Sequence, residues 1–344
     1  MDKLRFAIAG CGEIAVATAE GMAHAPHAQI VMAMDAKSEL AEDMANRHQA
    51  RATTSFEEVL SSQDVDAIYI ATPHFLHLPM ALAAAQAGKH VLLEKPMATN
   101  VADAKQIIEA FARNKVRLGI AFHAQVDGLC RRVRELVQAG VIGDVYAMLY
   151  VYLGDKPASY WHGGYTGRVQ TDWRTSKEKA GGGVLIMNLI HDFNTVRYIT
   201  GLEATLVFGQ YGTFVTPVEV EDLAFATVRY ANQAIGSIAA GSAIRGGSPG
   251  LDGDRIYGTQ GQIVLGHERR LYTAKGGPGL AAGEWIPLLG EEGTQRRNIV
   301  EGFAEAVLED REPPVTGTDG LRALEIVEAV YRSSESGQPV KLPL

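Results

Sequence analysis

The sequence is poor in cysteine, in long apolar runs and in excess positive charge, and each shortage excludes a class of protein. The two cysteines, Cys11 and Cys130, are too few for a disulfide framework and lack the spacing of a metal site. No apolar stretch approaches the roughly 20 residues that span a bilayer. Lysine and arginine number 32 against 40 acidic residues, and the net charge of −8 argues against nucleic acid or an anionic membrane as a partner.

Signatures of several other chemistries are also missing. There is no P-loop motif, and the ten histidines form no acid- or cysteine-accompanied ligand set, so no metal site is expected. The first apolar run is too short for a signal peptide and leads into a glycine turn. Together with the scarce cysteines, this predicts a reducing, cytoplasmic location. The length of 344 residues predicts two domains.

The first 122 residues alternate short, continuous apolar runs with helix-like segments. Strands are predicted at 6–10, 30–34, 67–71, 90–93 and 117–122, and helices at 14–24, 37–48, 78–87 and 101–114. This alternation predicts an α/β domain with a parallel, doubly wound sheet. Such a sheet binds its ligand at the carboxyl ends of the strands.

The pattern changes after residue 122. A helix at 129–139, a strand at 145–153 and a polar, aromatic loop at 154–179 precede an apolar helix, which Gly181-Gly182-Gly183 opens and Gly201 closes. Strands are then predicted at 206–213, 223–230, 235–242, 255–258 and 263–265, and helices at 297–309 and 320–334. The chain is therefore predicted to have a domain at 1–122 and, at 123–344, an α+β domain with an open, mostly antiparallel sheet.

A dinucleotide-binding loop is predicted where the first strand meets the first helix. Gly10-x-Gly12-x-x-Ala15 has the required spacing, and Glu13 and Ile14 open the helix whose N-terminus would face the phosphates. Asp35 ends the second strand, where a carboxylate accepts hydrogen bonds from the ribose diol and repels a 2′-phosphate. We therefore expect NAD as cofactor, with NADP as the alternative because Lys37 lies nearby.

Glu94-Lys95-Pro96 follows another apolar strand on the predicted cofactor side of the sheet. Pro96 disfavours helical geometry at Lys95. A lysine there can hydrogen-bond a substrate hydroxyl and take up its proton, provided that burial lowers its pKa towards neutrality. Taken alone, a surface lysine paired with Glu94 is the simpler interpretation.

At this point the chain resembles a known family, the glucose–fructose oxidoreductase / inositol dehydrogenase / MocA-type oxidoreductases. The similarity covers nearly the whole chain, with the motifs in order: Gly10-Cys11-Gly12-Glu13-Ile14, Ala71-Thr72-Pro73-x-x-x-His77, Ala87-Gly88-Lys89-His90-Val91, Glu94-Lys95-Pro96, Gly140-Val141-Ile142-Gly143-Asp144-Val145, Gly181-Gly182-Gly183 with His191, and Gly258-Thr259-x-Gly261. It implies a Rossmann domain and an open-sheet domain that often mediates homodimers or homotetramers. It also implies hydride transfer between NAD and a sugar or polyol carbon.

The resemblance assigns roles to individual residues. Lys95 and His191 map to the pair that flanks the substrate carbon in the family. Without the family, a histidine in an apolar helix such as 184–199 is more often a core residue than a catalyst. The predicted cofactor-binding residues are Gly10, Gly12, Glu13, Ile14, Asp35, Thr72, Pro73, His77, Glu94 and Lys95.

Two positions depart from the family pattern. Many members have aspartate four residues before the histidine, where this chain has Met187; Asn188 supplies hydrogen bonds there but no charge. Many members also have arginine where this chain has Gln125, with His123 close by. Both differences suggest a pocket altered for an unusual or neutral substrate.

The loop at 154–179 is the densest cluster of aromatic and charged side chains in the chain. Rings stack on sugar faces, and aspartate and arginine fix hydroxyl groups, so the loop is expected to choose the substrate. An oligomer contact is the alternative, since such residues are also enriched at interfaces. The predicted substrate-binding residues are His123, Gln125, Tyr160, Tyr165, Arg168, Asp172, Trp173, Arg174 and Asn188.

Two other functions stay open at this stage. A redox-neutral, NAD-dependent glycosidase-type enzyme would oxidise its sugar only transiently and accumulate no NADH. A non-catalytic NAD-binding regulator would respond to the cofactor by binding a protein partner. The retention of Lys95 and His191 speaks against the regulator.

Overall fold

A computed structural model describes residues 3–248, 250, 253–290 and 294–344. The chain divides into two compact units, and each consists of three separate segments. Unit 1 comprises Met1–Val126, Ser159–Gly181 and Glu292–Leu321; unit 2 comprises Asp127–Ala158, Gly182–Glu291 and Arg322–Leu344. The predicted boundary after residue 122 is a single cut in the sequence, whereas these units interleave along it.

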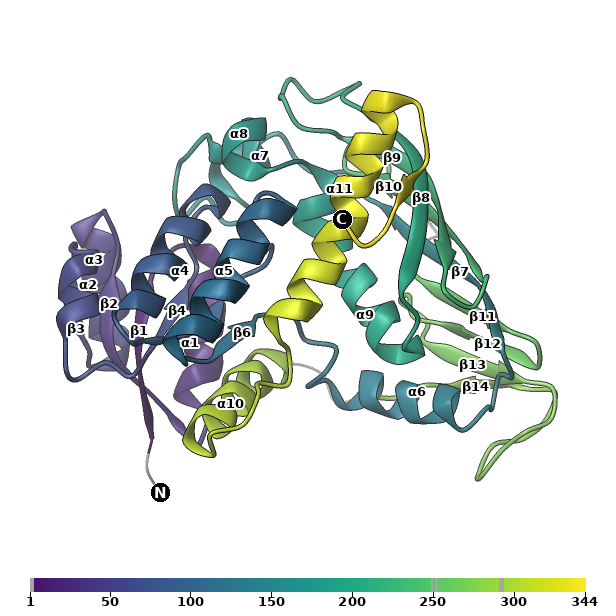
Figure 1. Ribbon diagram of the computed structural model, residues 1–344, viewed down its shortest axis with the longest axis horizontal. Coiled ribbons are helices and arrows are strands. Elements are labelled where there is room, and N and C mark those ends of the chain that lie inside the picture. The colour runs from purple at the N-terminus through teal and green to yellow at the C-terminus, as the bar shows by residue number, and fades with distance from the viewer. Residues whose placement is uncertain (1–2, 249, 251–252, 291–293) are drawn as a thin grey trace. The chain divides into compact units, whose positions relative to one another are not determined.

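Unit 1 is built on a parallel sheet of six strands in the order β3-β2-β1-β4-β5-β6 (Figure 1). The strands are β1 (Leu4–Ala9), β2 (Ala28–Met34), β3 (Arg51–Thr53), β4 (Ala67–Ile70), β5 (His90–Leu93) and β6 (Leu118–Ile120). This order is that of the doubly wound Rossmann fold and confirms the predicted class. The short strand β3 was not predicted.

Helices connect these strands in the expected places. They are α1 (Glu13–Ala23), α2 (Ser38–His48), α3 (Phe56–Ser61), α4 (His77–Gln86) and α5 (Val101–Asn114). The sequence explains their ends: the Asn100 side chain accepts a hydrogen bond from the Asp103 amide at the start of α5, and Gly88 has a φ of +72° just after α4. The helix α3 was not predicted.

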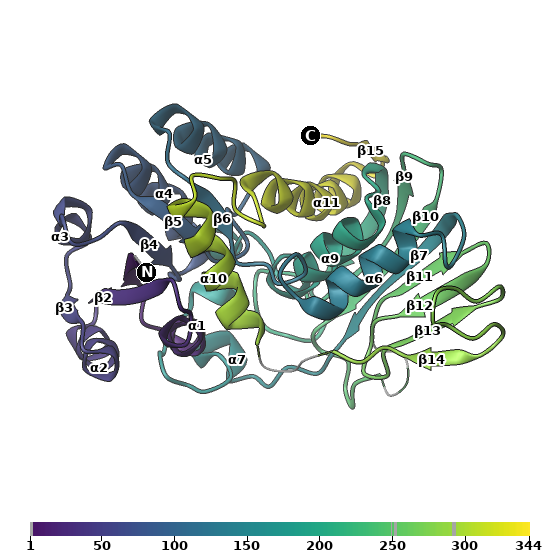
Figure 2. The ribbon, with the colours of Figure 1, turned by 90° about the horizontal axis from the view of Figure 1, so that it is seen from below.

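A helix distant in sequence completes the core of unit 1. Figure 2 shows α10 (Gln295–Leu308) alongside α1. Phe303 packs its ring 6.0 Å from that of Phe6, and a Cβ at Gly21 would lie 2.8 Å from the Arg297 backbone nitrogen. This glycine therefore permits α1 and α10 to approach each other closely, and α10 covers apolar surface of the Rossmann sheet.

Unit 2 contains a mostly antiparallel sheet of nine strands, as predicted, in the order β14-β13-β12-β11-β7-β10-β9-β8-β15. Its β7–β10 pair is parallel. The strands are β7 (Val145–Leu153), β8 (Ala204–Gly212), β9 (Leu223–Tyr230), β10 (Ile235–Gly241), β11 (Arg255–Gly258), β12 (Gly261–Val264), β13 (Arg270–Thr273), β14 (Trp285–Pro287) and β15 (Val340–Lys341).

The helices of unit 2 pack on this sheet. They are α6 (Gly128–Gln138), α9 (Ile190–Thr200) and the part of α11 (Gly317–Ser336) that follows Leu321. Phe193 of α9 meets Tyr150 of β7 edge-on, with ring centroids 5.2 Å apart. Among the described residues, no helix is long and apolar enough to cross a membrane.

Candidate active site

The dinucleotide loop in unit 1 has the geometry that phosphate binding requires. Gly10 has a φ of +90°, and a Cβ there would lie 2.8 Å from the Ala71 carbonyl oxygen at the end of β4. Gly12 caps α1 without a side-chain hydrogen bond, so backbone N–H groups of the first helical turn point out of the loop. Only glycine fits at position 10, and the helix N-terminus is suited to a pyrophosphate. Ile14 lies in that first turn.

Asp35 follows β2 beside this loop. Its carboxylate accepts hydrogen bonds from the Cys11 amide at 2.8 Å and the Lys37 amide at 3.0 Å. These two bonds fix the carboxylate at the edge where a ribose diol would bind. Cys11 is itself fully buried, and burial, followed by the Asp35 charge, raises the pKa of its thiol to about 12.

Glu94 and Lys95 directly follow β5, at the carboxyl edge of the same sheet. Glu94 is buried, and its carboxylate accepts hydrogen bonds from the Tyr69 hydroxyl at 2.6 Å and from Arg296 of α10 at 3.0 Å. The Lys95 amide donates to the other Glu94 oxygen at 3.2 Å. Three segments of unit 1 therefore fix the backbone from which the Lys95 side chain extends. Tyr69 and Arg296 were not predicted from the sequence.

The histidine of the Thr72-Pro73 motif binds backbone carbonyls. His77 is fully buried, with Nδ1 2.8 Å from the Pro96 oxygen and Nε2 3.0 Å from the Thr72 oxygen. Burial lowers its pKa against the opposing effect of the two carbonyls, and whichever ring nitrogen carries a proton donates to the carbonyl beside it. His77 joins the ends of β4 and β5, and any effect on a cofactor passes through the backbone of Thr72 and Pro96.

The Ser159–Gly181 segment, which contains most of the predicted substrate residues, lies in unit 1 and contacts the dinucleotide loop. The Tyr165 amide donates to Glu13 at 3.0 Å. Arg168 donates to the Cys11 carbonyl at 3.1 Å and to Asp43 at 2.6 Å. Both contacts lie at the cofactor loop, which was not expected for a segment predicted to choose the substrate.

The other end of this segment packs on the η1 turn (His74–Leu76). The ring of Trp173 lies 4.4 Å from that of His74, and Arg174 stacks over Trp173 and over the buried Tyr160. The carboxylate of Asp172, by contrast, is exposed and pairs with Lys179 at 3.5 Å. His123 and Gln125 lie apart from this segment in sequence, where they follow β6 half-buried.

The triple glycine in unit 2 opens the helical stretch that carries His191. The buried Glu221 carboxylate accepts hydrogen bonds from the Gly183 amide at 2.6 Å and the Leu185 amide at 3.0 Å, and the Tyr331 hydroxyl donates to it at 2.8 Å. A Cβ at Gly182 would collide with Tyr331, and one at Gly183 with the Glu221 backbone. Positions 182 and 183 therefore require glycine, because Glu221 and Tyr331 approach the backbone closely where the Glu221 carboxylate caps the start of the helix.

The helix itself begins with a π-turn, η3 (Leu185–Leu189), and continues as α9. Met187 is buried in the π-turn, and His191 is half-buried in α9. In a π-turn, residues five apart are hydrogen-bonded, rather than four apart as in an α-helix. Met187 and His191 therefore do not line up on one helical face as the sequence predicted.

A buried lysine faces this helix and was missed in the sequence. Lys156, only 6% exposed, donates from Nζ to the Asn188 Oδ1 at 2.7 Å. A buried cation held by an amide next to His191 is a functional candidate. Lys156 follows a strand in a polar loop, and nothing in its neighbours marks it as buried, so the sequence offered no signal for it.

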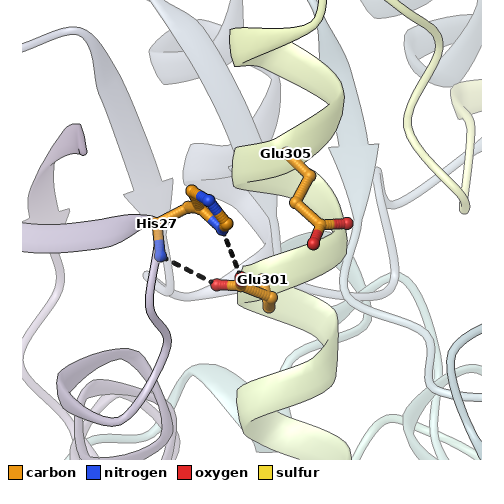
Figure 3. A group of neighbouring side chains, drawn as sticks. All are labelled: His27, Glu301 and Glu305. Carbon is orange, nitrogen blue, oxygen red and sulfur yellow. Dashed lines mark hydrogen bonds and ion pairs between the residues drawn. The ribbon is translucent and has the colours of Figure 1, made fainter. Parts of the chain in front are cut away.

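One group in the described part of the chain has the geometry of metal ligands: His27, Glu301 and Glu305 of unit 1 (Figure 3). Each is already engaged, because His27 Nδ1 lies 2.5 Å from Glu301 Oε1 and Glu305 pairs with Arg311 at 3.3 Å. The His27 amide also donates to Glu301 at 3.1 Å. We interpret the group as an anchor that holds α10 to the loop before β2.

The sheet order, the glycine loop and the Asp35 carboxylate define a dinucleotide-binding protein of the Rossmann class. The residues present fit NAD: a glycine that no larger residue can replace, an N-terminal helical turn without a side-chain cap, and a fixed carboxylate at the ribose edge. The chain belongs to the GFO/IDH/MocA oxidoreductase family. Residues 4–122 match its NAD-binding Rossmann model and residues 130–264 its C-terminal domain model.

Relatives align over most of the chain. The chain is 28% identical to 1,5-anhydro-D-fructose reductase of Ensifer adhaerens, with 98% of each protein covered. It is 27% identical to levoglucosan dehydrogenase of Pseudarthrobacter phenanthrenivorans, over 90% of this chain and 88% of the relative. A structure of levoglucosan dehydrogenase with NADH and levoglucosan superimposes with a TM-score of 0.86 at 25% identity, covering 100% of both chains.

Proposed function

We propose that this protein is an NAD-dependent dehydrogenase that transfers hydride between the nicotinamide and a hydroxyl-bearing carbon of a sugar, anhydrosugar or polyol. The observation that carries the proposal is Lys95, placed at the carboxyl edge of an NAD-binding sheet by the buried Glu94, Tyr69 and Arg296 network. Two relatives that align over nearly the whole chain act on anhydrosugars, which supports this substrate class.

The chemistry divides between the cofactor and the protein. The Gly10–Gly12 loop and Asp35 would hold NAD, which when bound would supply the hydride acceptor. Lys95 and His191 bind the substrate hydroxyl and take up its proton, so that the carbinol becomes a carbonyl with charge and atoms balanced. Lys95 belongs to unit 1 and His191 to unit 2.

Substrate recognition is proposed for a smaller set than the sequence suggested. Asn188, held by Lys156, supplies polar groups one helical turn from His191. His123 and Gln125 follow the last strand of the Rossmann sheet and would add neutral hydrogen-bonding groups. Tyr165 and Arg168 contact the cofactor loop instead, so we assign them to cofactor retention.

Assembly and location complete the proposal. The open face of the nine-stranded sheet carries exposed Phe208, Phe225 and Ile235 from adjacent strands, which favours a homodimer or homotetramer through this face. Both cysteines are free and buried, as suits a protein of the reducing cytoplasm.

NADH formation across a panel of aldoses, inositols, anhydrosugars and sugar acids, with NAD and NADP in parallel, tests the function. A substrate-dependent rise at 340 nm that is faster with NAD supports it. We expect Lys95→Met to lower kcat by about a thousandfold while NADH still binds, as for loss of a proton-transfer group. Lys3→Met, which removes an exposed lysine of the same unit, is the matched control.

Two outcomes would contradict the proposal. Lys95→Met turnover equal to that of wild type would remove Lys95 from the chemistry. NADH binding without turnover of any panel member would favour the redox-neutral enzyme, and release of a sugar from glycosides with no net NADH would establish it.

A further inference from the structure

The Ser159–Gly181 segment, called the strap below, contacts the rest of unit 1 at two places along its length. At one end the His74 ring nitrogen Nδ1 lies 2.8 Å from the Ala180 carbonyl, and a Cβ at Gly181 would lie 2.7 Å from the Thr99 carbonyl oxygen. At the other end the Tyr165 amide binds Glu13, the first residue of α1. The strap therefore runs along the carboxyl edge of the Rossmann sheet, from β5 to the dinucleotide loop.

Arg168 makes the contacts that fasten the middle of the strap. Its Nε donates to the Cys11 carbonyl and its Nη2 to the Asp43 carboxylate, so one guanidinium joins the dinucleotide loop to α2. The next residue, Val169, lies 4.0 Å from the position of a Cβ at Gly12. The Arg168 side chain is 20% exposed and that of Asp43 37%, so water screens this ion pair in part, and the bond to the Cys11 carbonyl fixes the guanidinium from a second side.

The partners of Arg168 surround the expected position of the adenosine ribose and pyrophosphate. Cys11, whose carbonyl Arg168 holds, donates its amide to Asp35. The same residue thus connects the strap to the carboxylate that would bind the ribose. A dinucleotide bound on Gly10–Gly12 would have the strap fastened across the edge through which it enters and leaves.

Two glycines shape the strap beside Glu13. Gly164 and Gly167 have φ values of +70° and +69°, and they flank the segment that binds Glu13. These residues adopt left-handed conformations without the cost that other residues would incur. Arg168 holds the middle of the strap, and His74 holds its end independently, so we expect loss of the Arg168 contacts to release the middle alone.

We propose that Arg168 is a positioning residue that, through Asp43 and the Cys11 carbonyl, fastens the strap over the bound dinucleotide and slows its release. This inference rests on the proposed NAD binding. It assigns to Arg168 a role in cofactor retention in place of the substrate contact expected from its sequence.

Direct measurement of NADH release separates this inference from the proposed catalysis. The purified, full-length protein is loaded with NADH, chased with excess NAD, and followed by nicotinamide fluorescence in a stopped-flow instrument. We expect Arg168→Ala to release NADH about tenfold faster than wild type, since loss of a contact that holds the strap in place acts mainly on dissociation. The KM for NAD should rise by a larger factor than kcat falls.

Asp43 and Arg47 supply a second variant and a matched control. Asp43→Asn should accelerate release as Arg168→Ala does, and the double variant should be no faster than either single one. Arg47 also pairs with Asp43, at 3.0 Å, from one turn further along α2. Arg47→Ala should therefore keep the release rate within twofold of wild type.

The outcomes are distinguishable. Suppose that wild type binds NADH and that Arg168→Ala and Asp43→Asn release it at the wild-type rate. Arg168 then has no retaining role, whether or not the protein oxidises sugars. Additive effects of Arg168→Ala and Asp43→Asn would also overturn the proposal, because they would show that the two residues act separately. Failure of wild type to bind NADH would instead overturn the proposed function.

Discussion

Asp254 is a buried carboxyl group in unit 2 that lies close to the helix of His191. Burial, reinforced by the charge of Asp192, raises its pKa well above the ordinary range. The hydroxyls of Tyr150 and Tyr230, 2.6 Å apart, share this environment, and the Val151 amide donates to the carboxyl at 3.4 Å. Asp254 is therefore protonated in the folded protein at pH values at which the unfolded chain ionises it.

This raised pKa predicts a pH-dependent stability. The Asp254 carboxyl makes its full contribution to the free energy of unfolding below the pKa of about 4 that it has in the unfolded chain. That contribution is lost as the pH rises towards the higher pKa of the folded protein. Asp254→Asn, which stays neutral, should therefore gain stability relative to wild type as the pH rises from 4 to 8. Melting temperatures of both proteins across this range measure it.

Asp144→Asn serves as the control for that prediction, because Asp144 is an exposed aspartate of the same unit. Its difference from wild type should not vary with pH. A constant difference between Asp254→Asn and wild type across the range would contradict a raised pKa at Asp254.

At the scale of single residues, short-range motifs were predictable and long-range partners were not. Gly10 and Asp35 lie at strand ends, where spacing identifies them, whereas the role predicted for Lys95 came from the family resemblance. Lys156 and Glu221 acquire their roles from contacts with Asn188 and Gly183, 32 and 38 residues away in sequence. A single sequence does not show which distant polar groups meet in the core, so neither residue could be identified.

Among the elements, α10 depends on an anchor of its own. His27 and Glu301 join it to the loop before β2 across 274 residues of sequence (Figure 3). We expect His27→Ala to destabilise the protein by roughly 1 kcal/mol, the usual value of a partly buried hydrogen bond. Urea unfolding measures this, with His24→Ala, whose ring nitrogen Nδ1 contacts only the local Glu20 carbonyl, as the control.

The same group tests the expectation that the protein needs no metal. Treatment with EDTA, or addition of zinc chloride, should leave the melting temperature unchanged. A rise with zinc in wild type that is absent from His27→Ala would show that His27, Glu301 and Glu305 bind a cation, and the expectation would then be wrong.

Helices and strands with strong apolar patterns were predicted close to their observed bounds, as β5, α5, β7 and β9 show. The π-turn η3 was not, because its sequence has the same apolar character as an α-helix. The strap was expected to serve the substrate, since aromatic and charged residues suit sugars and cofactors alike. Its contacts with Glu13 and Asp43 decide its position, and composition carries no information about them.

For the whole molecule, the open face of the unit 2 sheet offers the main test of assembly. If this face is the subunit interface, Phe225→Arg should convert the oligomer to monomer, because a charge would be buried in an apolar contact. Light scattering coupled to gel filtration gives the mass directly. Leu308→Arg, a charge placed at a similarly exposed leucine of unit 1, should leave the mass unchanged. An unaltered mass in Phe225→Arg would exclude this face.

The interleaving of the two units limits how this protein can be recombined with its relatives. A gene chimera with one crossover after residue 122 would pair the Rossmann sheet of one parent with α10 and the strap of the other. Phe303 would then have to fit a foreign Phe6 and Gly119, and Arg168 a foreign Asp43. A chimera that takes all of unit 1 from one parent therefore needs five crossovers, at the points where the chain passes from one unit to the other.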